Sequence, residues 1–211
     1  MFSRYLCVCL MLLAGGQVWA AEVALVMSVQ GRVLRQATPV PLAVETFVKL
    51  NEGDRLSLAQ GSRLQLVYFE SGRQETWSGP GSLDLTLREG KPSGMAAPEV
   101  KQQPLLLTKQ LARTPALDGQ SRGGVTRLRA IQNPDAVARL ESSYQELRSK
   151  AAADDLEPEV YLLAGLLDMR QLDRIEKTLD RLQQDGPKND QAASLVALYR
   201  KAVKNAREGG N

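Results

Sequence analysis

The stretch GSRLQLVYFESGRQETWSGPG, residues 61–81, decides the fold of the first part of this 211-residue chain. Up to Phe69 its apolar side chains recur with the period of two that is typical of a β-strand. Gly72 can adopt the positive φ of a tight turn, and Trp77 lies in the returning strand. Gly79 and the proline after it end that strand. The stretch therefore predicts an antiparallel β-hairpin.

Similar short strands lie on both sides of this hairpin. Residues 23–29 alternate with the same period, residues 51–54 form a turn cluster, and leucines alternate with polar residues between 83 and 87. Short strands separated by turns at such intervals are typical of small all-β units. We therefore expect a small antiparallel β sandwich or barrel over residues 21–90.

The aromatic side chains of the hairpin allow two interpretations. Tyr68 and Trp77 either pack inside the β unit or form an exposed aromatic face that binds a glycan or a peptide. Tyr68 and Phe69 are adjacent and therefore point to opposite faces of their strand. Both can be buried only if both faces of the sheet are covered.

Residues 91–133 form a basic connector that contains prolines and glycines. It holds seven basic and two acidic residues, whereas the segments on either side are slightly acidic. Residues 105–111 can form a helical turn or a strand, and residues 124–130 can close the sheet as a last strand. The connector either meets an acidic partner or is a solvated linker. Its candidate contacts with an acidic partner are Lys101, Lys109, Arg113, Arg122, Arg127 and Arg129.

The last part of the chain, residues 134–208, has the apolar spacing of four helices. Asn133 before Pro134 is a favourable helix start, and Gly186 before Pro187 is a stop signal. Short connections between helices favour antiparallel helical hairpins. Together with the β unit, this pattern predicts an α+β protein.

The first 20 residues have the features of a secretory signal peptide. Arg4 supplies the positive charge, an apolar run covers residues 5–13, and small residues end the segment. That run is shorter than the roughly twenty residues of a membrane-spanning helix. We expect cleavage after Ala20 or Ala21, a periplasmic or secreted product, and no transmembrane segment in the mature chain.

The residue types of the chain limit its chemistry. Histidine is absent and both cysteines lie within the first nine residues, which argues against His- or Cys-based catalysis and metal binding. The net charge of +3 is too small for a general nucleic-acid-binding protein. We expect no cofactor, no metal site and no enzymatic activity.

Two acidic groupings have alternative interpretations. The four acidic residues between 154 and 159 can bind a hard cation or complement the positive end of the helix that follows them. A metal-dependent enzyme would use the first of these arrangements. Glu70 and Glu75 flank the hairpin turn, either as a carboxylate pair or as exposed charges, and we expect the latter.

Turn glycines and alternating apolar residues recur in a fixed order over about 70 residues of the β part, as Val29-x-Gly31-x-Val33, Leu50-x-x-Gly53-Asp54-x-Leu56, Gly61-Ser62-x-Leu64-x-Leu66-x-Tyr68-Phe69, Gly72 and Gly79-Pro80. This order and spacing resemble those of a FecR-like domain. The resemblance implies an extracytoplasmic β-rich module, whose best-known relatives are iron-uptake regulators that signal to a sigma factor. Those regulators carry a cytoplasmic segment and a membrane helix where this chain has its signal-like leader, so direct anti-sigma activity is not expected.

The helical part has apolar residues and a terminal proline at regular spacing, namely Leu162, Leu166, Leu172, Leu179, Leu182, Pro187-x-Asn189 and Ala192. This spacing is similar to that of a degenerate tetratricopeptide unit. Leu163 and Ile175 replace the small residues expected at two helix contacts, and one repeat is visible. The resemblance implies a helical-hairpin module.

These observations predict a non-catalytic envelope protein with a binding or scaffold role, one form of which is an accessory role in envelope signalling. Its partner would be another envelope protein, and Tyr161 in the helical part is a candidate contact. The alternative is a protein that binds the cell wall or another acidic polymer through the aromatic face and the basic connector.

Overall fold

The computed structural model describes residues 21–115 and 134–208. The leader at residues 1–20 and the strand expected at 124–130 lie outside the described residues.

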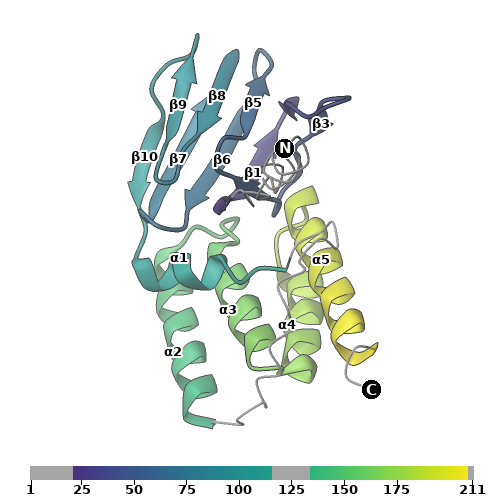
Figure 1. The fold of residues 1–211 in the computed structure, drawn as a ribbon. Helices are drawn as coiled ribbons and strands as arrows, with labels where there is room; N and C mark the ends of the chain where they lie inside the picture. The colour runs from purple at the N-terminus through teal and green to yellow at the C-terminus, as the bar shows by residue number, and fades with distance from the viewer. Residues whose placement is uncertain (1–20, 116–133, 209–211) are drawn as a thin grey trace, which may run out of the picture.

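Within these ranges the strands form two five-stranded sheets in which every pairing is antiparallel. Sheet 1 has the order β10-β7-β6-β1-β4, and sheet 2 has the order β3-β2-β5-β8-β9 (Figure 1). The predicted α+β class is confirmed. The strands are β1 (Glu22–Gln30), β2 (Val33–Arg35), β3 (Leu42–Ala43), β4 (Lys49–Asn51), β5 (Arg55–Leu58), β6 (Arg63–Tyr68), β7 (Arg73–Ser78), β8 (Gly81–Leu85), β9 (Gly90–Ser93) and β10 (Glu99–Gln102).

The predicted hairpin is formed by β6 and β7. Their register pairs Leu64 with Trp77, and Gly72 in the turn has a φ of 68°. The sheets continue past residue 90, the boundary expected from the sequence, because β9 extends sheet 2 and β10 extends sheet 1.

Five helices lie in the described part of the chain, and α1 resolves the choice between helix and strand at residues 105–111 in favour of a helix. Asn189 Oδ1 accepts the N–H of Ala192 at 2.8 Å and so caps α5. A Cβ on Gly165 of α3 would lie 2.5 Å from Leu140 Cδ1, so this glycine permits the close contact of α2 with α3. The helices are α1 (Leu105–Leu111), α2 (Pro134–Lys150), α3 (Glu157–Asp168), α4 (Leu172–Asp185) and α5 (Asp190–Glu208).

Sheet 1 is covered on both faces. Ala24, Val26 and Tyr68 point into the core that it shares with sheet 2. Leu25 and Val67, which alternate with them, point into a second core that they share with the helices. The molecule therefore has three layers, with sheet 1 between sheet 2 and the helices (Figure 1).

Because both faces of sheet 1 are covered, the adjacent residues Tyr68 and Phe69 can both pack against a core. Tyr68 is buried between the two sheets, and Phe69 packs against the core on the helical side. Gln191 of α5 also donates from Nε2 to the carbonyl oxygen of Met27 at 2.6 Å, which joins the helical layer to β1.

Candidate binding groove

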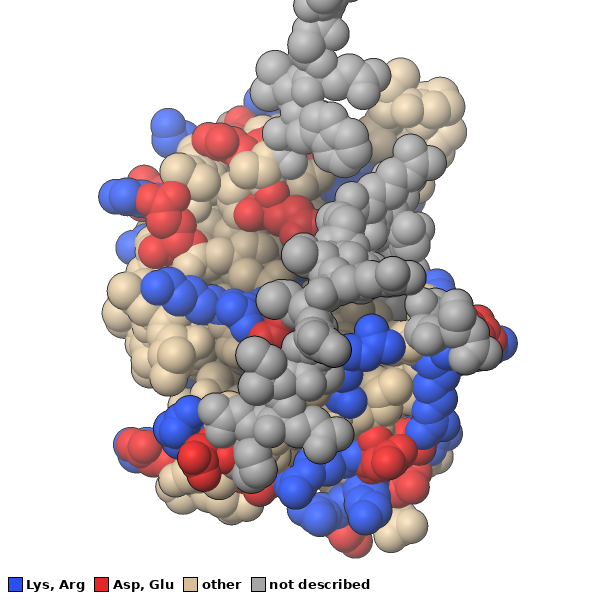
Figure 2. Space-filling model, turned by 60° about the horizontal axis from the view of Figure 1, so that its bottom comes forward, with Lys and Arg blue, Asp and Glu red and all other residues tan. Residues whose placement is uncertain are grey.

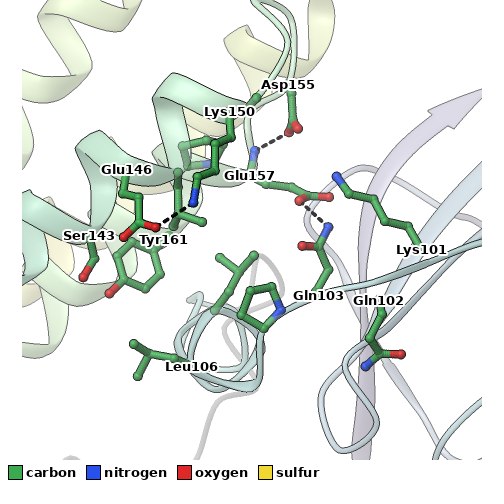
Figure 3. Close-up of a pocket in the computed structure, with 15 residues that line it drawn as sticks. Lys101, Gln102, Gln103, Leu106, Ser143, Glu146, Lys150, Asp155, Glu157 and Tyr161 are labelled. Carbon is green, nitrogen blue, oxygen red and sulfur yellow. Dashed lines mark hydrogen bonds and ion pairs between the residues drawn. The ribbon is translucent and has the colours of Figure 1, made fainter.

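A groove of about 460 Å³ lies where β10 and α1 meet the helices α2 and α3 (Figure 3). We call it the β10–α1 groove. Its floor contains the apolar side chains of Leu107, Leu147 and Tyr161, whereas the exposed Leu106 and charged groups lie at its rim. Mixed apolar and polar linings of this kind suit the side chains of a peptide. The other lining residues are Lys101, Gln102, Gln103, Pro104, Ser143, Glu146, Lys150, Ala151, Asp155, Glu157 and Pro158.

The sequence between β10 and α1 forms one wall of this groove. The N–H of Gln103 donates to the carbonyl oxygen of Gly72 at 2.7 Å, which fixes the end of β10 to the hairpin turn. Pro104 is the residue before α1, and its carbonyl oxygen accepts the N–H of Thr108 at 3.2 Å, which closes the first turn of the helix. Leu107 and Leu111 of α1 are buried in the helical core, whereas Leu106 keeps 66 % of its surface exposed. Burial of one side of α1 therefore presents its other side to solvent.

The strand β10 is an edge of sheet 1. Because Gln103 N–H faces the hairpin, the alternation of an antiparallel ladder turns the N–H groups of Val100 and Gln102 away from β7. Among the described strands, β10 is the longest edge without proline, since β9 contains Pro92 and the other two edges are shorter. Val100 is also 47 % exposed. This edge is open to pairing with another strand.

Glu157 lies at the start of α3 and is almost completely buried. Its Oε2 accepts a hydrogen bond from Gln103 Nε2 at 2.7 Å, and Gln103 also donates to Gln74 of β7. Burial, and then the negative charge of Asp155, raise the pKa of Glu157 to about 7, against the opposing effects of Lys101 and the two amides. The carboxyl group therefore lies at the contact between the β sandwich and the helical layer.

The charged side chains at the groove rim differ in the partners that they contact. Lys150 Nζ lies 2.6 Å from Glu146 Oε1, and Asp155 Oδ1 accepts the N–H of Glu157 at 2.9 Å. Lys101 extends from β10 toward Glu157 (Figure 3). The rim therefore offers both a cation and carboxylates to a ligand.

Two candidate contacts from the sequence are corrected by the structure. Tyr68 and Trp77 are buried between the sheets, so the exposed aromatic face does not exist in this conformation. The reason is that both side chains point toward sheet 2, which covers that face of the hairpin.

The other candidates divide into three groups. Tyr161 lies on the groove floor and is 5 % exposed. Arg113 follows α1 and pairs with Asp168 at the end of α3. Arg122, Arg127 and Arg129 lie outside the described residues. The groove therefore contains two of the predicted contacts, Tyr161 and Lys101 of the basic connector. The open edge of β10 and the buried carboxyl group of Glu157 were not predicted as parts of a binding site.

Glu75 corrects the expectation of a solvated hairpin. Its carboxylate is fully buried and accepts hydrogen bonds from Trp77 Nε1 and the N–H of Gly90, both at 3.0 Å, while Arg73 supplies the counter-charge. Gly90 belongs to β9 of sheet 2, so Glu75 links the two sheets. One feature of the sequence could have revealed this burial: Glu75 and Trp77 are two positions apart, which places both side chains on the same face of β7.

The four acidic residues before and within α3 do not converge on one point. Glu159 accepts from Arg148 at 3.0 Å and from the hydroxyl of Tyr144 at 3.2 Å, whereas Glu157 faces Gln103. Asp155 binds the N–H of Glu157, as expected for a carboxylate near a helix start. In the described part of the chain, no group of three or more acidic, histidine or cysteine side chains has the arrangement to hold a metal ion.

On the helical face, Lys and Arg side chains lie among Asp and Glu (Figure 2). Arg207 pairs with Asp173 and Glu176 at 3.3 and 2.9 Å, and Arg200 pairs with Asp180 at 3.2 Å. No helix within residues 21–115 and 134–208 has the length and apolar character to cross a membrane.

Comparison with family models, with curated proteins and with solved structures found no match to this chain. The resemblances to FecR-like domains and to tetratricopeptide units therefore stay predictions from the residues quoted above.

Proposed function

We propose that this chain is a non-catalytic, exported envelope protein that captures an extended segment of a partner protein in the β10–α1 groove. The partner segment pairs with the free edge of β10 and places an apolar side chain against Leu106 and Tyr161. The signal-like leader and the FecR-like residues support an extracytoplasmic location, and the absence of histidine supports a non-catalytic role.

The observation that carries this proposal is the coincidence of an open strand edge with exposed apolar side chains. Val100, Leu105 and Leu106 keep 47, 53 and 66 % of their surfaces exposed and lie within seven residues of one another. Strand addition supplies affinity through main-chain hydrogen bonds, and adjacent pockets for side chains supply specificity. Residues 100–106 offer both an open strand edge for main-chain pairing and apolar side chains for contact with the partner.

A site-specific photo-crosslinking experiment in living cells tests the proposal. The crosslinking amino acid p-benzoylphenylalanine replaces Leu106 in the groove or, as a matched control, Val40, which is 63 % exposed between β2 and β3. We expect a discrete protein adduct from position 106 and none from position 40. Mass spectrometry of the adduct should identify an extended segment of the partner.

A second substitution tests strand pairing. Val100→Pro removes an outward N–H and leaves the hydrogen bonds to β7 intact, whereas Val100→Thr keeps the N–H. We expect Val100→Pro to abolish the adduct at position 106 and Val100→Thr to retain it. An adduct of equal yield in both variants, or equal adducts at positions 40 and 106, would exclude capture at this edge.

A further inference from the structure

The buried polar cluster at the junction of the layers suggests a device that controls the groove. Gln74 comes from β7, Gln103 from the end of β10, and Glu157 from the start of α3. All three side chains are buried, and Gln103 bonds to both of the others. The cluster joins the β10–α1 wall of the groove to the helix on the opposite side.

We propose that Glu157 is a pH-sensitive latch, which holds the β10–α1 wall of the groove against α3 when its carboxyl group is neutral and releases that wall when the group ionises. This inference rests on the proposed function for its biological consequence, because release would strengthen capture of a partner segment. The latch itself is a property of the free protein.

The groups that face Glu157 explain why ionisation would strain this contact. Gln74 and Gln103, from β7 and from the end of β10, are neutral amides, whose hydrogen bonds favour the ionised form but supply no counter-charge. Asp155, from the connection before α3, adds a second negative charge, and Lys101 of β10 opposes it. Of the α2 residues at the groove, Lys150 is paired with Glu146.

Burial penalises the charge of a carboxylate unless water or a paired cation compensates it, and Lys101 offsets this penalty only in part, since the pKa of Glu157 stays raised. The neighbouring Glu159 differs, because Arg148 lies 3.0 Å from its carboxylate. The pKa of Glu157, raised to about 7 mainly by burial, places the change of charge near neutral pH. Separation of Gln103 from α3 would admit water to the ionised group and widen the groove.

Hydrogen exchange of the full chain, read by mass spectrometry at pH 6 and pH 8 with exchange times scaled for the intrinsic rate, tests the latch without a partner. We expect protection of residues 103–107 and 157–161 to fall about tenfold at pH 8 in the wild type. Glu157→Gln, which cannot ionise, should show no such fall. Glu146→Gln, a change at the same groove, is the control and should behave like the wild type.

A direct titration of the wild type keeps the test decisive if Glu157→Gln does not fold. The side-chain carboxyl resonance of Glu157, followed by ¹³C NMR, should titrate with a midpoint near pH 7. A midpoint near 4.5, an exchange pattern that does not change with pH, or a pH response retained in Glu157→Gln would overturn the latch.

Crosslinking at position 106 then separates the two proposals. An adduct that is several-fold stronger at pH 8 than at pH 6 supports the latch acting on capture, and an adduct unaffected by pH rejects it. The absence of any adduct at either pH contradicts the proposed function, whereas the exchange and NMR results still decide the latch.

Discussion

At the scale of single residues, two buried carboxyl groups of this protein have opposite environments. Glu75 has a cation, an indole N–H and a main-chain N–H as partners, so its charge is compensated inside the sandwich. Glu157 has amide partners and lies beside another carboxylate. The same residue type therefore serves as a structural tie in one place and as a candidate sensor in the other.

Replacement of Glu75 by alanine is expected to lower the free energy of unfolding by about 3 kcal/mol, because it leaves Arg73 and two N–H donors without their acceptor. Urea denaturation at pH 7 measures the loss. Glu70→Ala removes an exposed ion pair with Arg88 and should cost less than about 1 kcal/mol. Equal losses in the two variants would contradict the role assigned to Glu75.

The stability of the protein should depend on pH through Glu157. Its pKa rises from 4.5 in the unfolded chain to about 7 in the folded one, so the folded state binds more protons between these values. The contribution of Glu157 to the free energy of unfolding is therefore greatest below about pH 4.5 and declines as the pH rises to 7.

Glu157→Gln should abolish this decline and stabilise the protein at pH 8 by roughly 2–3 kcal/mol relative to the wild type. Melting temperatures at pH 5 and pH 8 measure the effect. Glu146→Gln is again the control, since its exposed carboxylate has a pKa lowered by Lys150 and does not titrate in this range. A wild-type decline that persists in Glu157→Gln would assign the pH dependence to other groups.

At the scale of secondary-structure elements, the hairpin turn after β6 positions the groove wall. Gly72 has a φ of 68°, and its carbonyl oxygen holds Gln103. A Cβ at this position would lie 2.7 Å from the carbonyl oxygen of Gln103 and 2.8 Å from Gln102 Nε2. The glycine is thus required both by its backbone conformation and by the chain that packs on it.

Gly72→Ala should therefore be more destabilising than Gly53→Ala. Gly53 also has a positive φ, of 83°, but a Cβ there meets no atom within 4 Å. We expect a loss of about 1 kcal/mol for Gly53→Ala, from the backbone alone, and a loss larger by about 1–3 kcal/mol for Gly72→Ala. Urea denaturation measures both. Equal losses would show that the contact with Gln103 adds no constraint.

At the scale of the whole molecule, the shared use of sheet 1 makes the β and helical parts interdependent. Val67 of β6 is buried in the helical core, while its neighbours Leu66 and Tyr68 are buried between the sheets. Loss of either outer layer would expose apolar surface of sheet 1 to water. The two parts should therefore unfold together.

Val67→Ala tests this expectation. We expect a loss of about 2 kcal/mol, and equal shifts of the unfolding midpoints reported by Trp77 fluorescence and by helical circular dichroism. Leu83→Ala, in the core between the sheets, should also shift both signals together. Separate midpoints, with Val67→Ala affecting the helical signal alone, would show two independent units.

The sequence alone determined the local structure of this protein. Alternation with a period of two predicted the strands around residues 61–81, and Gly72 predicted their turn, because these signals depend on backbone sterics and on neighbours in the chain. The spacing of apolar residues after position 134 likewise predicted helices in the region where α2 to α5 lie.

The tertiary structure alone decided which faces are covered and which groups meet. Val100 appears in the sequence as one residue of a connector, and its open edge exists because β10 joins sheet 1 beside β7. Gln74, Gln103 and Glu157 lie up to 83 positions apart in the chain, and only the packing of the helices on sheet 1 brings them together. Burial and long-range contact depend on the closure of the whole fold, which no local pattern of residues encodes.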